Sequence, residues 1–225
     1  RKPRRLPLEA LDPYSWSLPP EYNSGWGERR PSDASHPTIN WATLFGNRNP
    51  IEIEVGFGKG LFLVASGTAR PETNFFGIEI IRKYQLYAAT RIAQRDMKNV
   101  KTCCGDAKLV LRDFIEPASV QTVHIFFPDP WWKTRHKKRT LFTHEFTDLI
   151  LRVLVPGGHL HFVTDVADYF AMVSDILRDE PRLRELPKPE ENAPEHDMDY
   201  LTNFERKFRK EGRPIHRSLY QKRAT

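Results

Sequence analysis

The sequence predicts an α/β fold in which a mostly parallel sheet is covered by helices on both faces and ends in a C-terminal antiparallel hairpin. Three observations predict this fold. An apolar strand pattern at residues 51–55 runs directly into a glycine turn and then into a helical pattern. From there to residue 178, strand and helix patterns alternate, which is typical of the βαβ units that build parallel sheets. Two strand-like segments close to the C-terminus, separated by a turn at Gly212, predict the hairpin.

The predicted strands and helices follow one another in order. The strand at 51–55 precedes a helix over about 59–69, and the strand at 74–79 precedes an amphipathic helix over 81–96. Three further pairs follow: strand 100–104 with a short helix to about 114, strand 122–127 with helix 140–153, and strand 159–164 with helix 166–178. Residues 39–45 have loose helical spacing and are expected to pack beneath the first strand.

The C-terminal part of the chain has a different pattern. Residues 181–200 contain four prolines and a cluster of acids, which predicts a long surface loop. The segments 203–209 and 214–222 are the two predicted strands of the hairpin.

Length and composition fit one domain with additions. The chain has 225 residues, of which 39% are hydrophobic. We expect a domain over residues 39–225, preceded by a basic arm over residues 1–38 that is rich in proline and aromatic residues. No apolar run approaches the length of a membrane span, and no apolar stretch follows the basic N-terminus, so we expect neither a membrane segment nor a secretion signal.

The two cysteines, Cys103 and Cys104, are neighbours in a predicted strand. Their side chains therefore point to opposite faces, which argues against a shared metal ion and against a disulfide between them. A reduced, cytoplasmic protein without a metal is the simplest interpretation.

The glycine turn after the first strand indicates which cofactor the fold binds. Glycines at 56, 58 and 60 allow a ligand to approach the backbone closely. The dinucleotide fingerprint is G-x-G-x-x-G, but here the third glycine comes one place early. Glu54, one residue before the turn, would repel a pyrophosphate and attract the amino group and sulfonium of S-adenosylmethionine. The turn therefore favours S-adenosylmethionine over NAD or FAD.

Each of the five predicted parallel strands ends with an acid, namely Glu54, Glu79, Asp106, Asp129 and Asp165. The carboxyl ends of parallel strands meet at one edge of a sheet, which is where ligands bind. A single acid there is often only a helix N-cap, an equal alternative for Asp106, but five are difficult to explain as caps. Glu79 is placed to accept the ribose hydroxyls, and Asp106 to meet the adenine edge. The residues predicted to bind the cofactor are Glu54, Gly56, Gly58, Glu79, Asp106, Ala107 and Asp129.

A strongly basic charge balance points to a polyanionic partner. The net charge is +6, and the excess is clustered at residues 1–5, 133–139 and 206–223. The middle run directly follows Phe-Pro-Asp-Pro-Trp-Trp at 127–132, where two prolines fix the loop on either side of Asp129. A basic run joined to such a loop suggests DNA or RNA as the substrate. A solvated face is the alternative for any single run.

These motifs, taken in order, resemble those of the bacterial-type tRNA (guanine-N7-)-methyltransferase family. The resemblance covers about residues 50–223 and implies the Rossmann-like fold of class I methyltransferases. Its motifs are Glu-Val-Gly-Phe-Gly-Lys-Gly at 54–60, Gly-Ile-Glu-Ile at 77–80, Gly-Asp-Ala at 105–107, Phe-Phe-Pro-Asp-Pro-Trp at 126–131 with its basic tail, Thr-Asp at 164–165 and Thr-x-x-Glu at 202–205. At position 132 the family leads us to expect His, whereas this chain has Trp.

The resemblance implies methyl transfer from S-adenosylmethionine to N7 of a guanine in the variable loop of tRNA, without an obligate protein partner. It implies that the guanine is contacted by Lys133, Asp165, Thr202, Asn203, Phe204 and Glu205. It also implies that RNA is contacted by Arg135, His136, Lys137, Lys138, Arg139 and Thr140. Guanine N7 carries a lone pair and no proton, so the transfer needs no strong base. Asp129 is the predicted catalytic residue, because its carboxylate would offset the positive charge that develops on the base.

Three alternatives compete with this interpretation. A methyltransferase could act on another nucleic-acid atom or on a small molecule, although the basic runs argue against a small molecule. A non-catalytic RNA-binding protein could retain the fold, but it would not need an acid at every strand end. An NAD enzyme is disfavoured by the glycine spacing and by Glu54.

Overall fold

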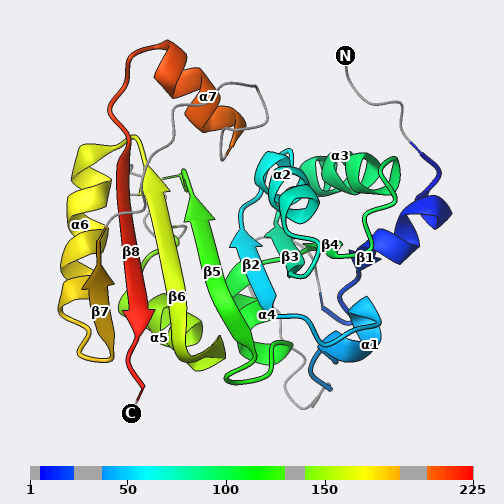
Figure 1. Cartoon of the computed structure of the whole chain (residues 1–225), viewed down its shortest axis with the longest axis horizontal. Helices are drawn as coiled ribbons and strands as arrows, with labels where there is room; N and C mark the ends of the chain where they lie inside the picture. Colours follow the sequence, from blue (N-terminus) through cyan, green and yellow to red (C-terminus); the bar gives the residue numbers. More distant parts are fainter. Residues whose placement is uncertain (1–5, 23–36, 130–139, 188–201, 225) are drawn as a thin grey trace.

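The computed structural model describes residues 6–22, 37–129, 140–187 and 202–224. Its centre is an eight-stranded sheet with the strand order β1-β4-β3-β2-β5-β6-β8-β7 (Figure 1). The strands are β1 (Ser15–Trp16), β2 (Ile51–Val55), β3 (Asn74–Glu79), β4 (Val100–Cys104), β5 (Val120–Phe126), β6 (Leu154–Thr164), β7 (Leu183–Leu186) and β8 (His216–Lys222).

The five strands from β2 to β6 are parallel, as predicted. The chain builds β3 and β4 on one side of β2 and then returns to build β5 and β6 on the other side. The strand order therefore reverses between β2 and β5. In open α/β sheets the carboxyl ends of the strands at such a reversal form the crevice in which ligands bind.

The helices cover both faces of this sheet. Residues of α2 and α3 pack in one apolar cluster with β3 and β4, whereas α4, α5 and α6 contribute to a second cluster that involves β2, β3, β5 and β6. The helices are α1 (Trp41–Phe45), α2 (Leu61–Ala69), α3 (Arg82–Ala93), α4 (Ala107–Asp113), α5 (His144–Val153), α6 (Ala167–Arg178) and α7 (Asn203–Lys210). The predicted helix at 140–153 begins later than expected because the Thr143 hydroxyl accepts a hydrogen bond from the Phe146 amide and caps α5 at that point.

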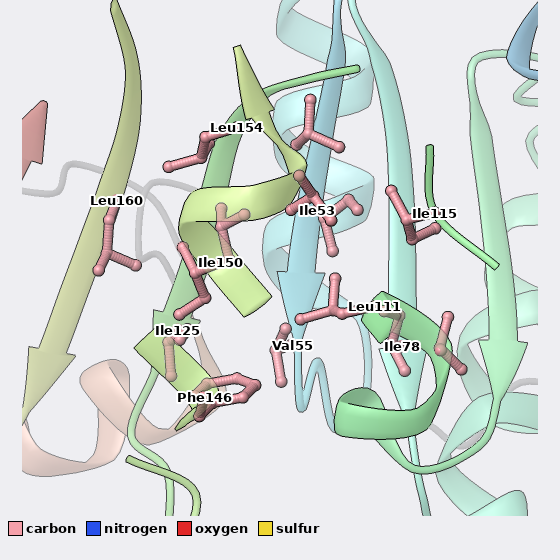
Figure 2. Packing of buried hydrophobic residues seen from close by; sticks show 14 of the residues in the cluster. Ile53, Val55, Ile78, Leu111, Ile115, Ile125, Phe146, Ile150, Leu154 and Leu160 are labelled. Atoms are coloured by element: carbon pink, nitrogen blue, oxygen red, sulfur yellow. The ribbon is translucent and has the colours of Figure 1, made fainter. Parts of the chain in front are cut away.

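β2 has one apolar face and one acidic face. Ile53 and Val55 point into the larger core cluster, where they pack against Ile78, Ile125 and other apolar side chains of the strands, α4 and α5 (Figure 2). Successive strand residues point to opposite faces, so Glu52 and Glu54 lie on the other side, and both are buried. Burying a carboxylate is unfavourable unless a partner neutralises it or a ligand does so. Glu52 and Glu54 differ in whether they have such a partner within the protein.

The C-terminal antiparallel edge is confirmed, but the prediction of its two strands was partly wrong. β8 is antiparallel to β6, and its second partner is β7 rather than the segment 203–209. That segment is helix α7, because Thr202 caps its first turn and Arg209 forms an i,i+4 ion pair with Glu205. The predicted loop over 181–200 was wrong at 183–186, which is β7, and residues 188–200 lie outside the described residues.

The described part of the N-terminal arm packs against the sheet. Residues Leu8–Tyr14 form the 3₁₀ helix η1, and β1 extends the sheet beyond β4 in parallel. The Tyr14 hydroxyl donates a hydrogen bond to Asp96, which holds this part of the arm beside α3. The predicted boundary between arm and domain at residue 38 stays a prediction. Within the described ranges, none of the helices combines the length and hydrophobicity needed to cross a lipid bilayer.

Candidate functional site

A cavity of about 210 Å³ lies at the carboxyl ends of β2, β3, β4 and β5, at the reversal of strand order. Six of the seven predicted cofactor-binding residues line it: Gly56, Gly58, Glu79, Asp106, Ala107 and Asp129. The seventh, Glu54, is buried and does not line the cavity, although its neighbours Val55 and Gly56 do. The structure thus brings together the ends of four strands that are far apart in the sequence.

The glycine turn between β2 and α2 opens onto this cavity. Gly56 and Gly58 have φ angles of 74° and 55°, which favour glycine, and a Cβ on either would meet nothing within 4 Å. Gly60 also has a positive φ, 68°, and has a second reason to be glycine, because a Cβ there would lie 2.7 Å from the Cβ of Ala88 on α3. The first two glycines therefore serve the cavity, and the third serves the contact between α2 and α3.

Glu79 is fixed at the end of β3 by two backbone amides. Its Oε2 accepts a hydrogen bond from the Gly58 N–H at 2.9 Å, and its Oε1 accepts one from the Ile81 N–H at 2.9 Å. Each carboxylate oxygen keeps a further lone pair for a ligand. Burial raises the pKa of Glu79 despite these hydrogen bonds, and the charge of Asp129 adds to the increase.

Glu54 is the most deeply buried acid of the site. It is 2% exposed, and its Oε2 has no hydrogen-bond partner. Burial, and then the charge of Glu79, raise the pKa of Glu54 well above its usual range. Within the described part of the chain, no cationic side chain forms an ion pair with Glu54, Glu79 or Asp129. A buried carboxyl with an unpartnered oxygen, next to Glu79 and close to a cavity that Asp129 also lines, fits a cationic ligand.

Asp106 and Asp129 complete the acids at the cavity. Asp106 lines the cavity and also caps α4, since its Oδ1 accepts a hydrogen bond from the Lys108 amide at 2.8 Å. Asp129 is exposed at the rim, in the loop that begins at Phe127. Phe127 has a positive φ of 50°, an uncommon conformation for an aromatic residue, and its amide donates a hydrogen bond to the Val163 carbonyl at 2.7 Å. This geometry turns the chain so that Asp129 shares the crevice with Gly56 and Glu79.

The apolar wall of the cavity was not predicted from the sequence. Ile81 is 45% exposed, which is unusual for a large aliphatic residue, and Tyr84 follows it one turn into α3. Leu141, after the basic run, lies on the same cavity. The sequence signal for this wall is the position of these residues just after β3 and just after the basic run. These side chains offer apolar surface for a planar ligand group.

The residues expected on the guanine side occupy a different part of the same edge. Asp165 follows β6 and accepts a hydrogen bond from Arg213 at 2.9 Å. Glu205 on α7 is buried and is contacted by Arg209 and Arg217. Thr202 caps α7, and the side chains of Asn203 and Phe204 are not among those described. Lys133 and the run 135–139 lie outside the described residues, whereas the Thr140 carbonyl lies 3.5 Å from Lys108 Nζ.

Glu52, the second acid of β2, belongs to a structural network. Arg70 binds both of its oxygens, at 2.6 and 2.9 Å, and His124 Nε2 lies 2.8 Å from Oε2. Burial alone would raise the pKa of Glu52, but the hydrogen bonds from His124 and Arg70 lower it to about 2. The same strand therefore holds one acid in a structural ion-pair network and one, Glu54, with an unpartnered oxygen next to the residues that line the cavity.

Comparisons with known proteins agree with this geometry. The family model described as "Putative methyltransferase" matches residues 48–218. The chain is 44% identical to a tRNA (guanine-N(7)-)-methyltransferase of Rhodopirellula baltica, over the whole of this chain and 82% of that protein. It is 35% identical to the protein of that name from Aliivibrio fischeri, over 74% of this chain and 70% of the relative.

Solved structures show the same fold at low sequence identity. The antibiotic-resistance methyltransferase Kmr superposes with a TM-score of 0.55 at 16% identity, covering 83% of this chain and 95% of Kmr. A SAM-dependent O-methyltransferase from Thermotoga maritima superposes with a TM-score of 0.52 at 15% identity, over 82% of this chain and 63% of that protein. Similarity at this level identifies a class I methyltransferase fold.

Proposed function

Since the chain belongs to the tRNA (guanine-N(7)-)-methyltransferase family, we propose that it transfers the methyl group of S-adenosylmethionine to N7 of a guanine in the variable loop of tRNA. The main observation in support of this proposal is the group of acids at the point between β2 and β5 where the strand order reverses. Glu79 and Asp129 line one crevice, Glu54 is buried next to Val55 and Gly56 that also line it, and none of the three acids has a cationic partner among the described residues. A nucleoside cofactor with a sulfonium and an ammonium group supplies that charge.

The lining of the cavity suits each part of S-adenosylmethionine. Glu79, held by two backbone amides, would accept hydrogen bonds from the ribose hydroxyls. Asp106 and Ala107 begin α4 beside the cavity and would meet the adenine, with Ile81 and Tyr84 as its apolar surface. Glu54 and the open turn at Gly56 would lie toward the methionine end. The bound cofactor supplies an activated methyl group on a positively charged sulfur.

The reaction requires little acid–base catalysis by the protein. Guanine N7 has a lone pair and no proton, so its attack on the methyl carbon requires positioning and charge stabilisation. Asp129, exposed at the rim of the cavity, would accept hydrogen bonds from the N1–H and 2-amino groups of guanine. Its negative charge would stabilise the base as positive charge develops there. Asp129 is accordingly the proposed catalytic residue.

The tRNA would be bound largely through its phosphates. The chain has a net charge of +6, with basic runs at 133–139 and 206–223 on either side of the guanine-side acids in the sequence. Thr202, which precedes α7, and Glu205 within it, together with Asp165, would contact the guanine. We further propose that the enzyme acts in the cytoplasm without a second protein, as the resemblance to the bacterial type implies.

One experiment tests this proposal. The protein is incubated with methyl-labelled S-adenosylmethionine and unmodified tRNA, and the labelled nucleoside is located by digestion and mass spectrometry. We expect label at N7 of one variable-loop guanine, and none in a control tRNA that carries 7-deazaguanine at that position. Label on another atom would identify a different methyltransferase, and cofactor binding without transfer would support a non-catalytic RNA-binding protein.

A further inference from the structure

Two arginines of one short segment bind the two acids on the guanine side of the site. Arg213 Nη1 lies 2.9 Å from Asp165 Oδ2, and Arg217 Nη2 lies 2.5 Å from Glu205 Oε1. Arg217 belongs to β8, Glu205 to α7, and Asp165 follows β6. The turn and strand over residues 213–217 thus connect helix α7 to the end of the sheet where β6 ends (Figure 1).

The two ion pairs differ in their exposure to solvent. The side chains of Arg217 and Glu205 are 7% and 5% exposed, whereas that of Arg213 is 51% exposed. An exposed pair is screened by water and contributes little, but a buried carboxylate depends on its partner both for its charge and for its orientation. Of these two ion pairs, the buried one between Arg217 and Glu205 is therefore the one expected to fix the orientation of its carboxylate.

Glu205 is held from two directions. Arg209, one turn further along α7, donates to Oε1 at 2.9 Å, and Arg217 donates to the same oxygen from β8. The Glu205 amide in turn donates to the Thr202 hydroxyl, which fixes the first turn of the helix. The contact from Arg209 stays within α7, whereas the contact from Arg217 links the carboxylate to the sheet.

We propose that Arg217 is a positioning residue for the guanine substrate, which acts by holding the Glu205 carboxylate at the end of β6. The proposal rests on the function proposed above, because that function assigns Glu205 to the guanine. Arg217 itself is buried in the sheet face and does not need to touch the base. Its effect on the reaction passes through Glu205, and this makes the proposal testable by a double-mutant cycle.

The test compares Arg217→Gln, Arg217→Lys, Glu205→Gln and the double variant R217Q/E205Q. Arg70→Gln is the matched control, because Arg70 also pairs with a buried glutamate of the sheet but makes its contacts at the amino end of β2. The measurements are KM for tRNA, kcat, the Kd for S-adenosylmethionine by calorimetry, and the melting temperature.

We expect R217Q to raise KM for tRNA about tenfold or more while the Kd of the cofactor stays within about twofold. R217K should recover part of the loss, and the double variant should be no worse than E205Q alone. R70Q should lower the melting temperature without changing KM for tRNA. Additive losses in the cycle, or an unchanged KM in a folded R217Q, would overturn the proposal.

A second comparison keeps the test decisive if R217Q is too unstable to assay. Arg217→Lys preserves the charge but loses the second donor group of the guanidinium fork, so it should raise KM for tRNA at an unchanged cofactor Kd. A lysine variant with a native melting temperature and native kinetics would overturn the proposal. If wild-type protein methylates an atom other than guanine N7, the proposed function fails instead, and the cycle data identify which of the two is wrong.

Discussion

Glu54 on β2 and Glu79 on β3 lie on the same side of the sheet on neighbouring strands, where the Glu54 register partner is Gly77. Burial raises the pKa of both carboxyl groups, and the charge of Glu79 adds to the increase at Glu54. Among the described residues, neither acid is balanced by a cation. In the absence of a ligand, protons are the charges that can neutralise this pair.

Cofactor binding should therefore release protons. A ligand with a positive charge favours the ionised carboxylates, so the affinity for S-adenosylmethionine should rise with pH until both carboxyls are ionised without it. Calorimetry in buffers of different ionisation enthalpy measures the number of protons released. Glu54→Gln should reduce that number and weaken binding, whereas Tyr84→Leu should weaken binding and leave the number unchanged. A binding enthalpy independent of the buffer would contradict this prediction.

Glu54 should lower the stability of the cofactor-free protein at neutral pH. Because the folded-state pKa of Glu54 is raised, the folded protein binds a proton that the unfolded chain releases above its ordinary pKa of 4.5. The contribution of Glu54 to stability is therefore full at acid pH and is lost as the pH rises toward the folded-state pKa. Glu54→Gln should melt at a higher temperature than wild type at pH 7, with a difference that narrows toward pH 5. A lower melting temperature at pH 7 would be the contrary outcome.

Local sequence signals were sufficient for the parallel sheet and most of the cavity. Buried strands, a glycine turn and helical periodicity predicted β2 to β6, and the rule that parallel strands end at one edge placed Glu79, Asp106 and Asp129 together. The strands and helices follow from residues close together in the sequence, and the meeting of the strand ends follows from the parallel order of the strands. Both could therefore be predicted without knowledge of side-chain contacts.

Contacts between distant segments could not be predicted in this way. The segment 203–209 has apolar residues whose spacing suits a strand as well as a helix, and the ion pairs with Glu205 that favour α7 include one from β8. The acid Glu52 resembles Glu54 in the sequence, and only its partners Arg70 and His124 separate a structural role from a functional one.

Asp129→Ala should lower turnover far more than it weakens tRNA binding. The carboxylate is proposed to stabilise charge that develops on guanine only during methyl transfer, so its loss affects the transition state more than the bound substrate. We expect kcat to fall about 100-fold, with the Kd for tRNA changed by about threefold or less. Single-turnover kinetics and filter binding measure the two quantities. Equal losses in both would assign Asp129 to building the site rather than to the reaction.

Arg70→Gln should destabilise the fold without affecting the reaction. Glu52 has a folded-state pKa of about 2, below its ordinary value of 4.5, so its network stabilises the protein above pH 4.5 and loses that contribution as the pH falls toward 2. Because Arg70 is partly exposed, we expect a loss of about 1–2 kcal/mol at pH 7 that shrinks between pH 4.5 and pH 3. Urea unfolding across this pH range measures it. A loss independent of pH would mean that Arg70 acts through packing instead.

The basic run that follows Asp129 should determine how tRNA binding responds to salt. Each phosphate contact releases condensed counterions, so replacing Arg135, Lys137 and Lys138 by Ala should raise the Kd for tRNA and flatten the plot of log K against log salt by about 0.7–0.9 per lost contact. A control with Arg178→Ala and Arg184→Ala removes one arginine at the end of α6 and one in β7, the far edge strand of the sheet. Its slope should equal that of wild type. If the triple variant also keeps the wild-type slope, the run 133–139 is a solvated surface and other cations bind the RNA.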